Sequence, residues 1–398
     1  MLAALAQNPP TAAAPSVRMG QQTGASIEQG HFVLTMMPSL FCELDCPHCY
    51  LSKVERRDPT RLRNSAIRRV LENVDRFYDS RGIARKTIHA YQYGGEPTSM
   101  GVDAFSGMLD VIEAALPAHK GYDVRHTILT SLVEVELEAW LPIFRDRCGG
   151  FLQTSFDGRM RGGSYLRKWE AQMHKAWDLG LTLSTISVIN TRILADGPEA
   201  TLDYLADLDV VEASFLPFMW NEQNDGKKYD ALAPTMSAWS DFMIRLTQAW
   251  IARRRQGLAA PEIGQLRYIL AQASMDSPVS NIAGQTLFLM PNGDFALPDY
   301  QRGWQEFMNR FANGLSSDFG AVLASPKRRA YLRRQMTRNG NPECLSCPHA
   351  DKCVMEFWKD NRPDDDCFGG RRYVDWVMQH RDEILALDAG RQHSFSLY

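Results

Sequence analysis

Between residues 31 and 218, short runs of β-forming residues alternate with longer segments of helical periodicity. The β-forming runs are rich in Val, Ile, Leu, Thr and aromatic residues. They cover 31–38, 86–93, 126–132, 150–156, 181–189 and 210–218. Alternation of this kind is typical of βαβ units, in which helices connect parallel strands. The sequence therefore predicts an α/β fold with a parallel sheet in this region.

The segments between and after these runs carry apolar residues at helical spacing. In 61–80, for example, Ile67, Val70 and Val74 would lie on one face of a helix. Helices are predicted at 61–80, 103–116, 134–146, 163–179, 235–256 and 372–386. The strand–helix alternation ends near residue 220, and Asn292-Gly293 between two apolar runs predicts a β-hairpin.

Charge and hydropathy exclude several classes of partner. The 44 Lys and Arg residues nearly balance the 47 Asp and Glu residues, which gives a net charge of −3. A chain so balanced has no general attraction to nucleic acid or to an anionic membrane. No run of apolar residues is long enough for a transmembrane helix. The start, MLAALAQNPPTAAAPS, lacks the basic and apolar regions of a secretory signal, so a cytoplasmic protein is expected.

The cysteines indicate metal binding. Seven of the eight fall into two local groups, one near each end of a long chain. The two groups are Cys42, Cys46, Cys49 and Cys344, Cys347, Cys353, Cys367. A disulfide scaffold would instead be short and rich in cysteine throughout, so these groups are interpreted as metal ligands. The eighth, Cys148, is expected to be a buried, inert thiol.

The first group directly follows the first predicted strand. Three thiolates can hold an iron–sulfur cubane but leave one iron open, and an open iron can bind a small molecule. The alternative is a structural zinc site, for which His48 could serve as the fourth ligand. Spacing alone favours the open cubane but does not decide between the two.

This segment resembles the radical S-adenosylmethionine (SAM) superfamily. The family has the same three-cysteine spacing with an aromatic residue beside the last cysteine, here Tyr50. The second predicted strand ends in Gly94-Gly95-Glu96-Pro97, which is similar to the family's GGEP motif. By this resemblance the three cysteines hold the SAM-cleaving cluster, and the motif binds the SAM amino group. The glycines would let the backbone approach the ligand, and Glu96 would offer a carboxylate to the ammonium.

The same resemblance extends to the ends of the fourth and fifth predicted strands. Ser155 and Asp157 stand in a segment similar to the family's S-(L/F)-D-G pattern. It implies that Ser155 faces the SAM carboxylate or ribose and that Asp157 lies on the substrate side; for Asp157 an ordinary strand-end turn is equally expected. Val188 and Asn190 would flank the adenine and ribose. Residues 31–218 would then form a partial (β/α)6 TIM-like barrel with its site at the carboxyl ends of the strands.

The C-terminal group supplies four thiolates, enough to close a metal site. It resembles the SPASM extension of some radical SAM enzymes, which holds auxiliary 4Fe-4S clusters, although structural zinc is not excluded by spacing. Three cysteines of the full SPASM pattern are missing: Phe357 and Pro298 stand at two of their positions, and 260–290 contains none. All three would belong to one auxiliary cluster. The resemblance therefore implies two 4Fe-4S clusters in all, with SAM as the further cofactor.

These resemblances imply four segments and an enzymatic function. The segments are a mobile N-terminal tail, a radical SAM partial barrel, a helical linker and a small cysteine-rich Fe-S extension, at 1–30, 31–232, 233–275 and 276–398. The implied function is reductive cleavage of SAM to a 5′-deoxyadenosyl radical, which abstracts a hydrogen atom from a peptide. The product would be a crosslinked, epimerised or oxidised ribosomal peptide.

Two other functions stay open on the sequence alone: radical SAM chemistry on a sugar or small metabolite, and a non-catalytic zinc-binding scaffold. The implied partners are a peptide substrate and an external one-electron reductant of the flavodoxin or ferredoxin type. The segment before residue 31 is too short for a leader-peptide-binding domain. A peptide would therefore be recognised by the barrel, by the extension or by a separate leader-peptide-binding protein.

Overall fold

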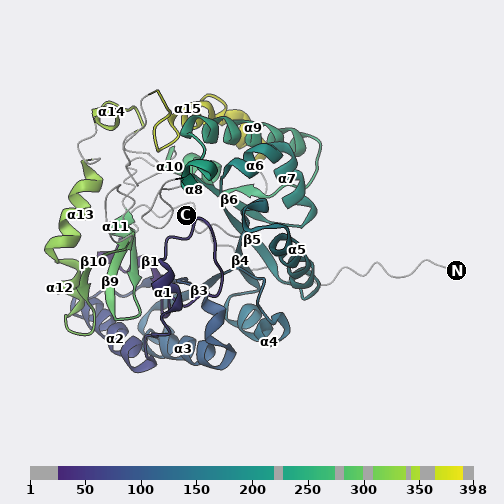
Figure 1. The fold of residues 1–398 in the computed structure, drawn as a ribbon. Coiled ribbons are helices and arrows are strands. Elements are labelled where there is room, and N and C mark those ends of the chain that lie inside the picture. Colours follow the sequence, from purple (N-terminus) through teal and green to yellow (C-terminus); the bar gives the residue numbers. More distant parts are fainter. Residues whose placement is uncertain are drawn as a thin grey trace.

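The computed structural model describes residues 26–218, 227–273, 282–298, 308–337, 342–349 and 364–388. Ten strands in this part of the chain form one sheet, in the order β10-β9-β8-β1-β2-β3-β4-β5-β6-β7 (Figure 1). In chain order, β1 to β10 are His31–Met36, Lys86–Gln92, Tyr122–Thr130, Phe151–Ser155, Thr182–Val188, Glu212–Leu216, Glu262–Ile263, Thr286–Leu289, Asp294–Pro298 and Met308–Asn313.

Strands β1 to β6 pair side by side and are all parallel. These are the six strands predicted from the alternation, so the α/β class and the parallel arrangement are confirmed. Parallel strands have to be joined by crossovers, and helices occupy these connections along the chain. The carboxyl ends of the six strands therefore come together at one edge of the sheet.

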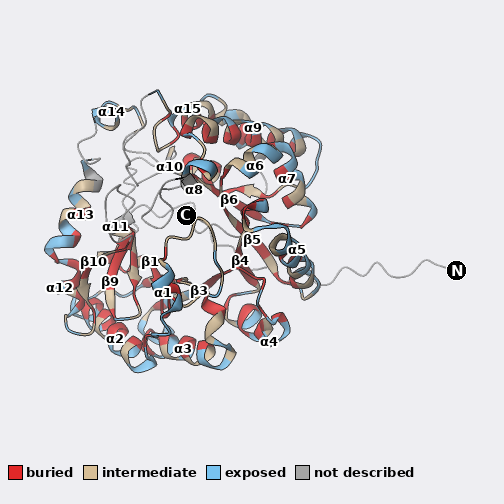
Figure 2. Cartoon of the chain, in the orientation of Figure 1, coloured by how far each residue is buried: buried red, intermediate tan, exposed pale blue. Residues whose placement is uncertain are grey.

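Helices pack along the outer side of the sheet (Figure 1). In chain order, α1 to α8 are Lys53–Arg57, Asn64–Ser80, Val102–Ala115, Leu137–Pro142, Gly163–Asp178, Thr191–Asp196, Pro198–Asp207 and Lys227–Leu232. Helices α9 to α16 are Met236–Arg255, Gly264–Ala273, Ile282–Gln285, Phe319–Leu323, Pro326–Met336, Pro342–Leu345, Arg371–Gln379 and Arg381–Asp388. The helices turn buried faces to the strands and exposed faces outward (Figure 2). None of these described helices has the length and apolarity that a membrane crossing requires.

Two predicted helices differ from the observed ones. The segment predicted at 134–146 starts as α4 and continues as η4, a turn of π-helix over Ile143–Arg147. The helix predicted at 372–386 is divided into α15 and α16 at His380. The His380 ring stacks on Trp376 with ring centroids 4.2 Å apart, and its backbone (φ −106°, ψ 10°) leaves the helix. Asp382 and Glu383 then favour a new helix start, because acidic groups stabilise a helix N-terminus.

The segment after residue 276 continues the sheet. Strands β8 and β9 form the hairpin predicted around Asn292-Gly293, and β8 pairs in parallel with β1. Strand β10 then pairs with β9 in the antiparallel direction. One sheet thus joins the segment expected to be the barrel to part of the segment expected to be the extension.

The start of the described chain belongs to the fold rather than to the predicted tail. Residues Ile27–Gln29 form η1, a turn of 3-10 helix, and Ile27 is fully buried. The Tyr78 hydroxyl donates to the Ile27 carbonyl at 2.6 Å, and Glu28 pairs with Arg328 at 3.2 Å. The predicted tail therefore extends at most to residue 25, and residues 1–25 lie outside the described part.

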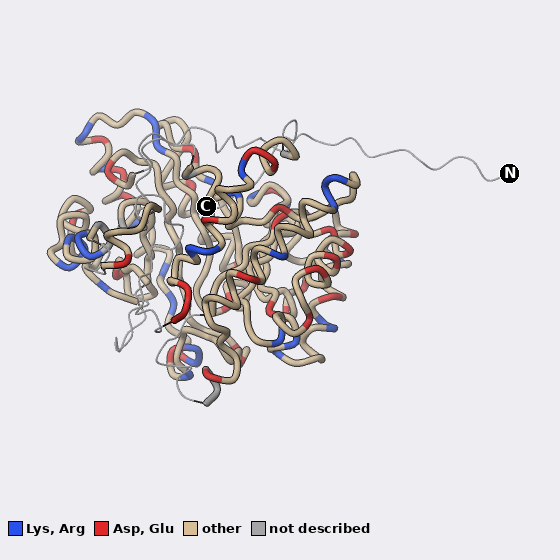
Figure 3. Tube along the Cα trace, turned by 90° about the horizontal axis from the view of Figure 1, so that it is seen from above, with Lys and Arg blue, Asp and Glu red and all other residues tan. Residues whose placement is uncertain are grey.

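Charged residues of both signs are interspersed over the molecule (Figure 3). Several of them form ion pairs across neighbouring elements. Arg147, at the end of η4, reaches Asp110 and Glu113 of α3 at 2.9 and 2.8 Å. Exposed pairs of this kind contribute little to stability individually, typically about 0–1 kcal/mol. The balanced charge of the sequence thus corresponds to ion pairs between neighbouring outer helices.

The inner face of the sheet carries polar and aromatic side chains. His126 on β3 contacts Glu113 of α3 at 3.2 Å, so its position faces the helices. The neighbouring Thr127 faces the opposite, inner side, where it bonds His89 of β2 at 2.8 Å. Two positions beyond His89, the Tyr91 hydroxyl donates to Gln153 of β4. These side-chain hydrogen bonds connect β2 to β3 and β4 on the inner face of the sheet.

Glu212 is a buried carboxylate at the first residue of β6, and its Oε2 atom has no hydrogen-bond partner among the residues that the structure describes. The charges that act on it are Arg267 of α10 and Glu262 of β7, which itself pairs with Arg254. Burial raises the pKa of Glu212 to about 7, from about 4.3 in an unfolded chain. The folded protein therefore retains a proton that the unfolded chain releases, and stability falls as pH rises through that window.

We expect Glu212→Gln to raise the free energy of unfolding at pH 8 by about 1–3 kcal/mol, because the neutral amide avoids a buried charge. The gain should shrink toward pH 5, where the native carboxyl is already protonated. Urea denaturation at both pH values measures it. Glu72→Gln, on the exposed face of α2, is the matched control and should change little. A loss of stability at pH 8 would mean instead that Arg267 offsets the cost of the charge.

Candidate active site

The first cysteine group lies on the loop that follows β1. The Cys42 amide donates to the Arg56 carbonyl of α1 at 2.9 Å. The Arg56 side chain in turn donates to the Leu44 carbonyl and, at 2.8 Å, to the Asp45 carboxylate. Helix α1 thus folds back on the loop and fixes the backbone between Cys42 and Cys46.

The three thiols of this loop lie close to one another. All are half-buried, and the thiols of Cys46 and Cys49 act electrostatically on Cys42. Burial raises the pKa of Cys42 to about 12 and that of Cys49 to about 11, and it also raises the pKa of Cys46. Without a metal the thiols are therefore protonated at neutral pH, and metal binding has to displace their protons.

The residues present fit a cubane better than a zinc ion. A cubane distributes three thiolates over three irons, so the sulfurs need not converge on one point. Among the described residues, no three His, Cys, Asp or Glu side chains are grouped to hold a single metal ion. The His48 ring, the fourth ligand that zinc would use, points to Asp157 instead, with Nε2 3.5 Å from Oδ2.

Gly94 and Gly95, directly after β2, pack against the backbone that leads into this loop. Gly94 has φ +129°, and a Cβ there would overlap the Ser39 carbonyl oxygen. A Cβ at Gly95 would overlap the carbonyl oxygens of Leu40 and Phe41. The Glu96 amide donates to the Phe41 carbonyl at 3.0 Å. The GGEP turn and the cysteine loop are therefore joined backbone to backbone.

We expect Gly95→Ala to disrupt this junction. The added methyl group would separate the turn from the loop, and a shift of about 1 Å at a reacting centre can lower a rate roughly 100-fold. The measurements are SAM cleavage and iron content after anaerobic reconstitution. Gly163→Ala is the matched control, because the one described atom that a Cβ there would approach within 4 Å is an Arg167 nitrogen, at 3.6 Å. Equal activity in Gly95→Ala and wild type would contradict this role.

Both carboxylate oxygens of Glu96 accept hydrogen bonds. Oε1 accepts from the Thr98 hydroxyl at 2.7 Å, at the start of η2 (Pro97–Met100), a short 3-10 helix that Pro97 begins. Oε2 accepts from the Ser131 amide at 2.8 Å, just past β3. On the other side of the turn, the Tyr50 hydroxyl donates to the Gly94 carbonyl at 2.7 Å. Tyr50 thus connects the cysteine loop to the GGEP turn.

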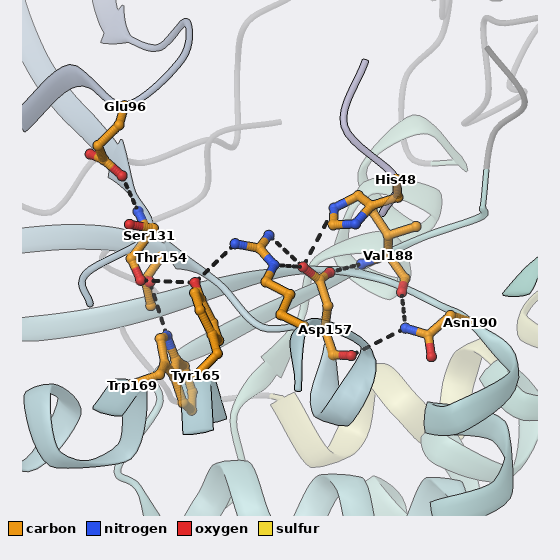
Figure 4. A network of polar contacts seen from close by, with 10 residues as sticks. His48, Glu96, Ser131, Thr154, Asp157, Tyr165, Trp169, Val188 and Asn190 are labelled. Carbon is orange, nitrogen blue, oxygen red and sulfur yellow. Dashed lines mark hydrogen bonds and ion pairs between the residues drawn. The ribbon is translucent and has the colours of Figure 1, made fainter. Parts of the chain in front are cut away.

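A chain of hydrogen bonds continues from Ser131 to Asp157 (Figure 4). The Tyr165 hydroxyl donates to the Ser131 carbonyl at 3.2 Å and accepts from Arg161 Nη1 at 2.9 Å. Arg161 Nε donates to Asp157 Oδ2 at 2.7 Å. Arg161 ends η5 (Gly158–Arg161), the short 3-10 helix after β4, and Tyr165 lies in the first turn of α5. These contacts link the ends of β3 and β4.

Asp157 is the centre of the network. Its carboxylate accepts from the Val188 amide at 3.0 Å and lies beside Arg161 and His48. Burial alone would raise the pKa of Asp157, but the Arg161 guanidinium lowers it below its usual value. Burial lowers the pKa of His48 to about 4, so the imidazole is neutral beside an ionised carboxylate. The buried Arg161 has a raised pKa and stays charged.

The predicted residues of the fifth strand lie at the same edge of the sheet. Asn190 caps α6 with its side-chain oxygen, and its Nδ2 donates to the carbonyls of Val188 and Asp157 at 3.0 and 3.2 Å. Its side chain therefore holds the ends of β4 and β5 together. Ser155, the last residue of β4, is half-buried and pairs in register with Ile186. Gly94 to Pro97 after β2, Ser155 at the end of β4, and Val188 and Asn190 at the end of β5 thus lie at the same edge of the sheet, and Tyr50 contacts this edge from the cysteine loop.

Solved structures share this architecture. A structure of native anSMEcpe with bound AdoMet and the peptide Cp18Cys matches 90% of this chain and 99% of its own, with a TM-score of 0.69 at 13% identity. The chain has the radical SAM fold. Sequence comparisons found no match, either among protein-family profiles or among curated proteins.

SuiB of Streptococcus suis has the same radical SAM fold. Bound to S-adenosylmethionine, it matches 83% of this chain and 76% of its own, with a TM-score of 0.56 at 16% identity. Bound to the precursor peptide SuiA, it matches 81% and 70%, with a TM-score of 0.55 at 14% identity. The partial TIM-like barrel predicted from the motifs is thereby confirmed.

Two cysteines of the C-terminal group lie close together. The Cys347 thiol acts electrostatically on Cys367, whose pKa burial raises to about 11. Cys344 is on α14, and its carbonyl accepts from the Cys347 amide at 3.2 Å. Cys353 lies outside the described residues. The structure thus places Cys347 near Cys367, which follows it by 20 residues in the sequence, and Cys344 one helical turn before Cys347.

The segment around Cys367 is docked on α9, the long helix after the barrel strands. Asp365 accepts from the amides of Met236 and Ser237, at 2.9 and 2.7 Å, and so caps the start of α9. Asp366 accepts from the Ser240 hydroxyl at 2.5 Å. Burial alone would raise the pKa of Asp365, but the bonds from Ser237 and Met236 lower it.

The sequence reasoning missed several residues of the site. His349 bonds Asp375 of α15 at 2.6 Å and ties the Cys347 segment to the Cys367 segment. Arg161, which pairs with Asp157, and Tyr165, which bonds Arg161, were also missed. They lie on separate helices, η5 and α5, divided at Gly162 (φ +95°), so no helical periodicity in the sequence connects them. Cys148, by contrast, is buried as predicted.

Proposed function

We propose that this chain is a radical SAM enzyme that modifies a peptide. The cubane on Cys42, Cys46 and Cys49 would supply one electron to bound SAM, giving methionine and a 5′-deoxyadenosyl radical that takes a hydrogen atom from a substrate carbon. The observation that carries this proposal is the backbone junction between the cysteine loop and the GGEP turn. That junction sets three thiols beside the motif suited to an ammonium group.

The chain's own residues would bind and orient SAM. Glu96 has an ionisable carboxylate held in place by Thr98 and Ser131, so it can accept from an ammonium without reorganisation. Ser155 and the backbone at Val188 lie at neighbouring strand ends, where a ribose or an adenine could lie. Asn190 keeps these strand ends fixed. Asp157 would hold His48 and Arg161 in place, and the substrate would lie on the side of this network away from SAM.

A peptide is the substrate class that the comparisons support. The structures of anSMEcpe and SuiB with the same fold are complexes with peptides. The inner wall of this chain offers an aromatic surface: Tyr50 and Tyr93 stack with ring centroids 5.7 Å apart, and Tyr93 and Tyr91 at 5.9 Å. Such a surface suits an extended chain of mixed side chains. Recognition could also involve a separate leader-peptide-binding protein.

The C-terminal cysteines would hold a second 4Fe-4S cluster. Cys344, Cys347 and Cys367 belong to one docked unit, and Cys353 would complete the four thiolates. We therefore propose two clusters per chain, with electrons delivered by a flavodoxin- or ferredoxin-type protein. The division into barrel 31–232, linker 233–275 and extension 276–398 is part of this proposal.

Anaerobic reconstitution and a peptide assay test the function. We expect about eight iron and eight sulfide per chain, from two cubanes. With a one-electron reductant, SAM should give 5′-deoxyadenosine, and a substrate peptide should change mass, by a loss of about 2 Da where a crosslink forms. About twelve iron per chain would refute the two-cluster count. Stoichiometric zinc without iron would refute the enzymatic proposal and favour the zinc-binding scaffold.

A further inference from the structure

Arg161 is a buried cation beside the three-cysteine loop. We propose that it is a positioning residue that stabilises the reduced state of the iron–sulfur cluster and fixes the loop against the strand ends. This inference rests on the proposed function, because it requires a cluster on Cys42, Cys46 and Cys49. It adds a role for a residue that none of the sequence motifs includes.

The contacts of Arg161 leave its guanidinium little freedom. Its side chain is 8% exposed, and that of its partner Asp157 is 1% exposed. Nε and Nη2 lie 2.7 and 2.5 Å from Asp157 Oδ2, and Nη1 donates to the Tyr165 hydroxyl at 2.9 Å. The face of the Tyr165 ring also lies 5.1 Å from the guanidinium carbon. A cation held on three sides keeps its position when a neighbouring group changes charge.

The positive charge of Arg161 reaches the cysteine loop. Of the charged groups around Cys46, Arg161 acts most strongly on the thiol, ahead of Asp157 and Arg56. It also acts on Cys49. Interactions between buried charges are weakly screened, so a fixed cation at this place affects any group that gains an electron there. Reduction adds one negative charge to a cluster, and the cation favours that state.

The same network couples the loop to the GGEP turn. His48, between Cys46 and Cys49, lies against Asp157, and Asp157 lies against Arg161. Tyr165 then leads through Ser131 to Glu96 (Figure 4). Arg161 therefore stands midway between the residues that would hold the cluster and the carboxylate that would hold the SAM amino group.

A second arginine provides a comparison. Arg56 also acts on the thiols, and on Cys49 it acts more strongly than Arg161. The Arg56 side chain is 9% exposed, and that of its partner Asp45 is 69% exposed. Arg161 is the cation that acts most strongly on Cys46, and its partner Asp157 is buried with it, so water screens neither of those two charges.

The test is a potentiometric titration of the reconstituted protein, followed by electron paramagnetic resonance, with neither SAM nor peptide present. The signal to follow is the one that the double variant Cys46→Ala, Cys49→Ala lacks. In Arg161→Gln, the ratio of reduced to oxidised cluster at a fixed potential should fall tenfold or more, about 59 mV for a one-electron couple. Arg161→Lys should retain most of the wild-type ratio, because it keeps the charge.

Arg167→Gln is the matched control, since Arg167 is an exposed arginine on α5. It should leave the ratio unchanged. Asp157→Asn should shift the ratio toward the reduced cluster, because it removes a negative charge from the same network. If Arg161→Gln fails to load iron, two other variants still test the inference. The ratio of reduced to oxidised cluster should rise in Asp157→Asn and stay close to the wild-type ratio in Arg161→Lys.

Three results would overturn the inference. One is a wild-type ratio in Arg161→Gln; another is an equal shift in Arg161→Gln and Arg161→Lys. The third is an unchanged ratio with weaker SAM binding, which would make Arg161 a SAM contact instead. If the wild-type protein holds no iron on these cysteines, the proposed function itself fails, and that result is visible before any variant is titrated.

Discussion

The double variant Cys46→Ala, Cys49→Ala is expected to lose reductive cleavage of SAM to 5′-deoxyadenosine completely. It leaves Cys42 as the one thiol of the loop, and a single thiolate cannot hold a cubane. Within the described part of the loop, His48 is not placed to replace the lost thiolates, because its Nε2 atom is directed to Asp157. Anaerobic incubation with dithionite and SAM, followed by chromatography for 5′-deoxyadenosine, measures the effect.

Cys148→Ala is the control for this variant. Cys148 is a buried thiol that ends η4 just before β4, at the amino end of that strand and so away from the strand ends that form the site. Its loss should cost about 1 kcal/mol of stability and leave SAM cleavage intact. Iron content should fall by about half in the double variant and stay at the wild-type value in Cys148→Ala. Persistent 5′-deoxyadenosine in the double variant would mean that SAM is cleaved elsewhere.

The six barrel strands could be predicted because each combines β-forming residues with a boundary. Strand β2, for example, alternates buried and half-buried residues from Lys86 to Gln92 and stops at Gly94-Gly95. Helix α2 shows its apolar face in the sequence, with Ile67, Val70 and Val74 buried. Such patterns depend on residues that are close together in the chain, so they can be recognised in a single sequence.

The continuation of the sheet could not be predicted in this way. Strand β8 pairs with β1, and the register joins Val33 to Thr286 across more than 250 residues. Nothing local in either strand specifies that partner. The division of the last helix at His380 depends similarly on a ring stack with Trp376, because the helical pattern of the sequence runs on through that residue.

The site shows the same limit. The cysteines and the GGEP turn were predicted because their residue types and spacing are specific. The contact between His48 and Asp157 was not, since a histidine between two cysteines is also what a zinc site would contain. Only the fold places the ends of β4 and β5 against the loop, and that placement makes His48 a partner of Asp157. Asp157 accordingly belongs to a structural network at least as much as to a substrate surface.

Cys367→Ala is expected to separate SAM cleavage from product formation. It removes one thiolate of the C-terminal group and leaves the barrel motifs unchanged, so 5′-deoxyadenosine should still form. The yield of modified peptide should fall steeply, by about tenfold or more, because electron removal or substrate positioning by the proposed second cluster would be lost. Mass spectrometry of the peptide and chromatography of 5′-deoxyadenosine, in the same reaction, give both quantities.

A second variant distinguishes loss of the cluster from loss of the fold, since small metal-binding segments can depend on their metal for folding. Asp365→Asn weakens the cap on α9 without touching a thiol. If Cys367→Ala acts through the cluster, its circular dichroism and its resistance to limited proteolysis should match wild type, and proteolysis should increase only in Asp365→Asn. If the cluster instead holds the segment in place, both variants should become sensitive to protease. A folded Cys367→Ala protein with full product yield would contradict both versions, because the docked thiol would then contribute neither to the fold nor to the reaction.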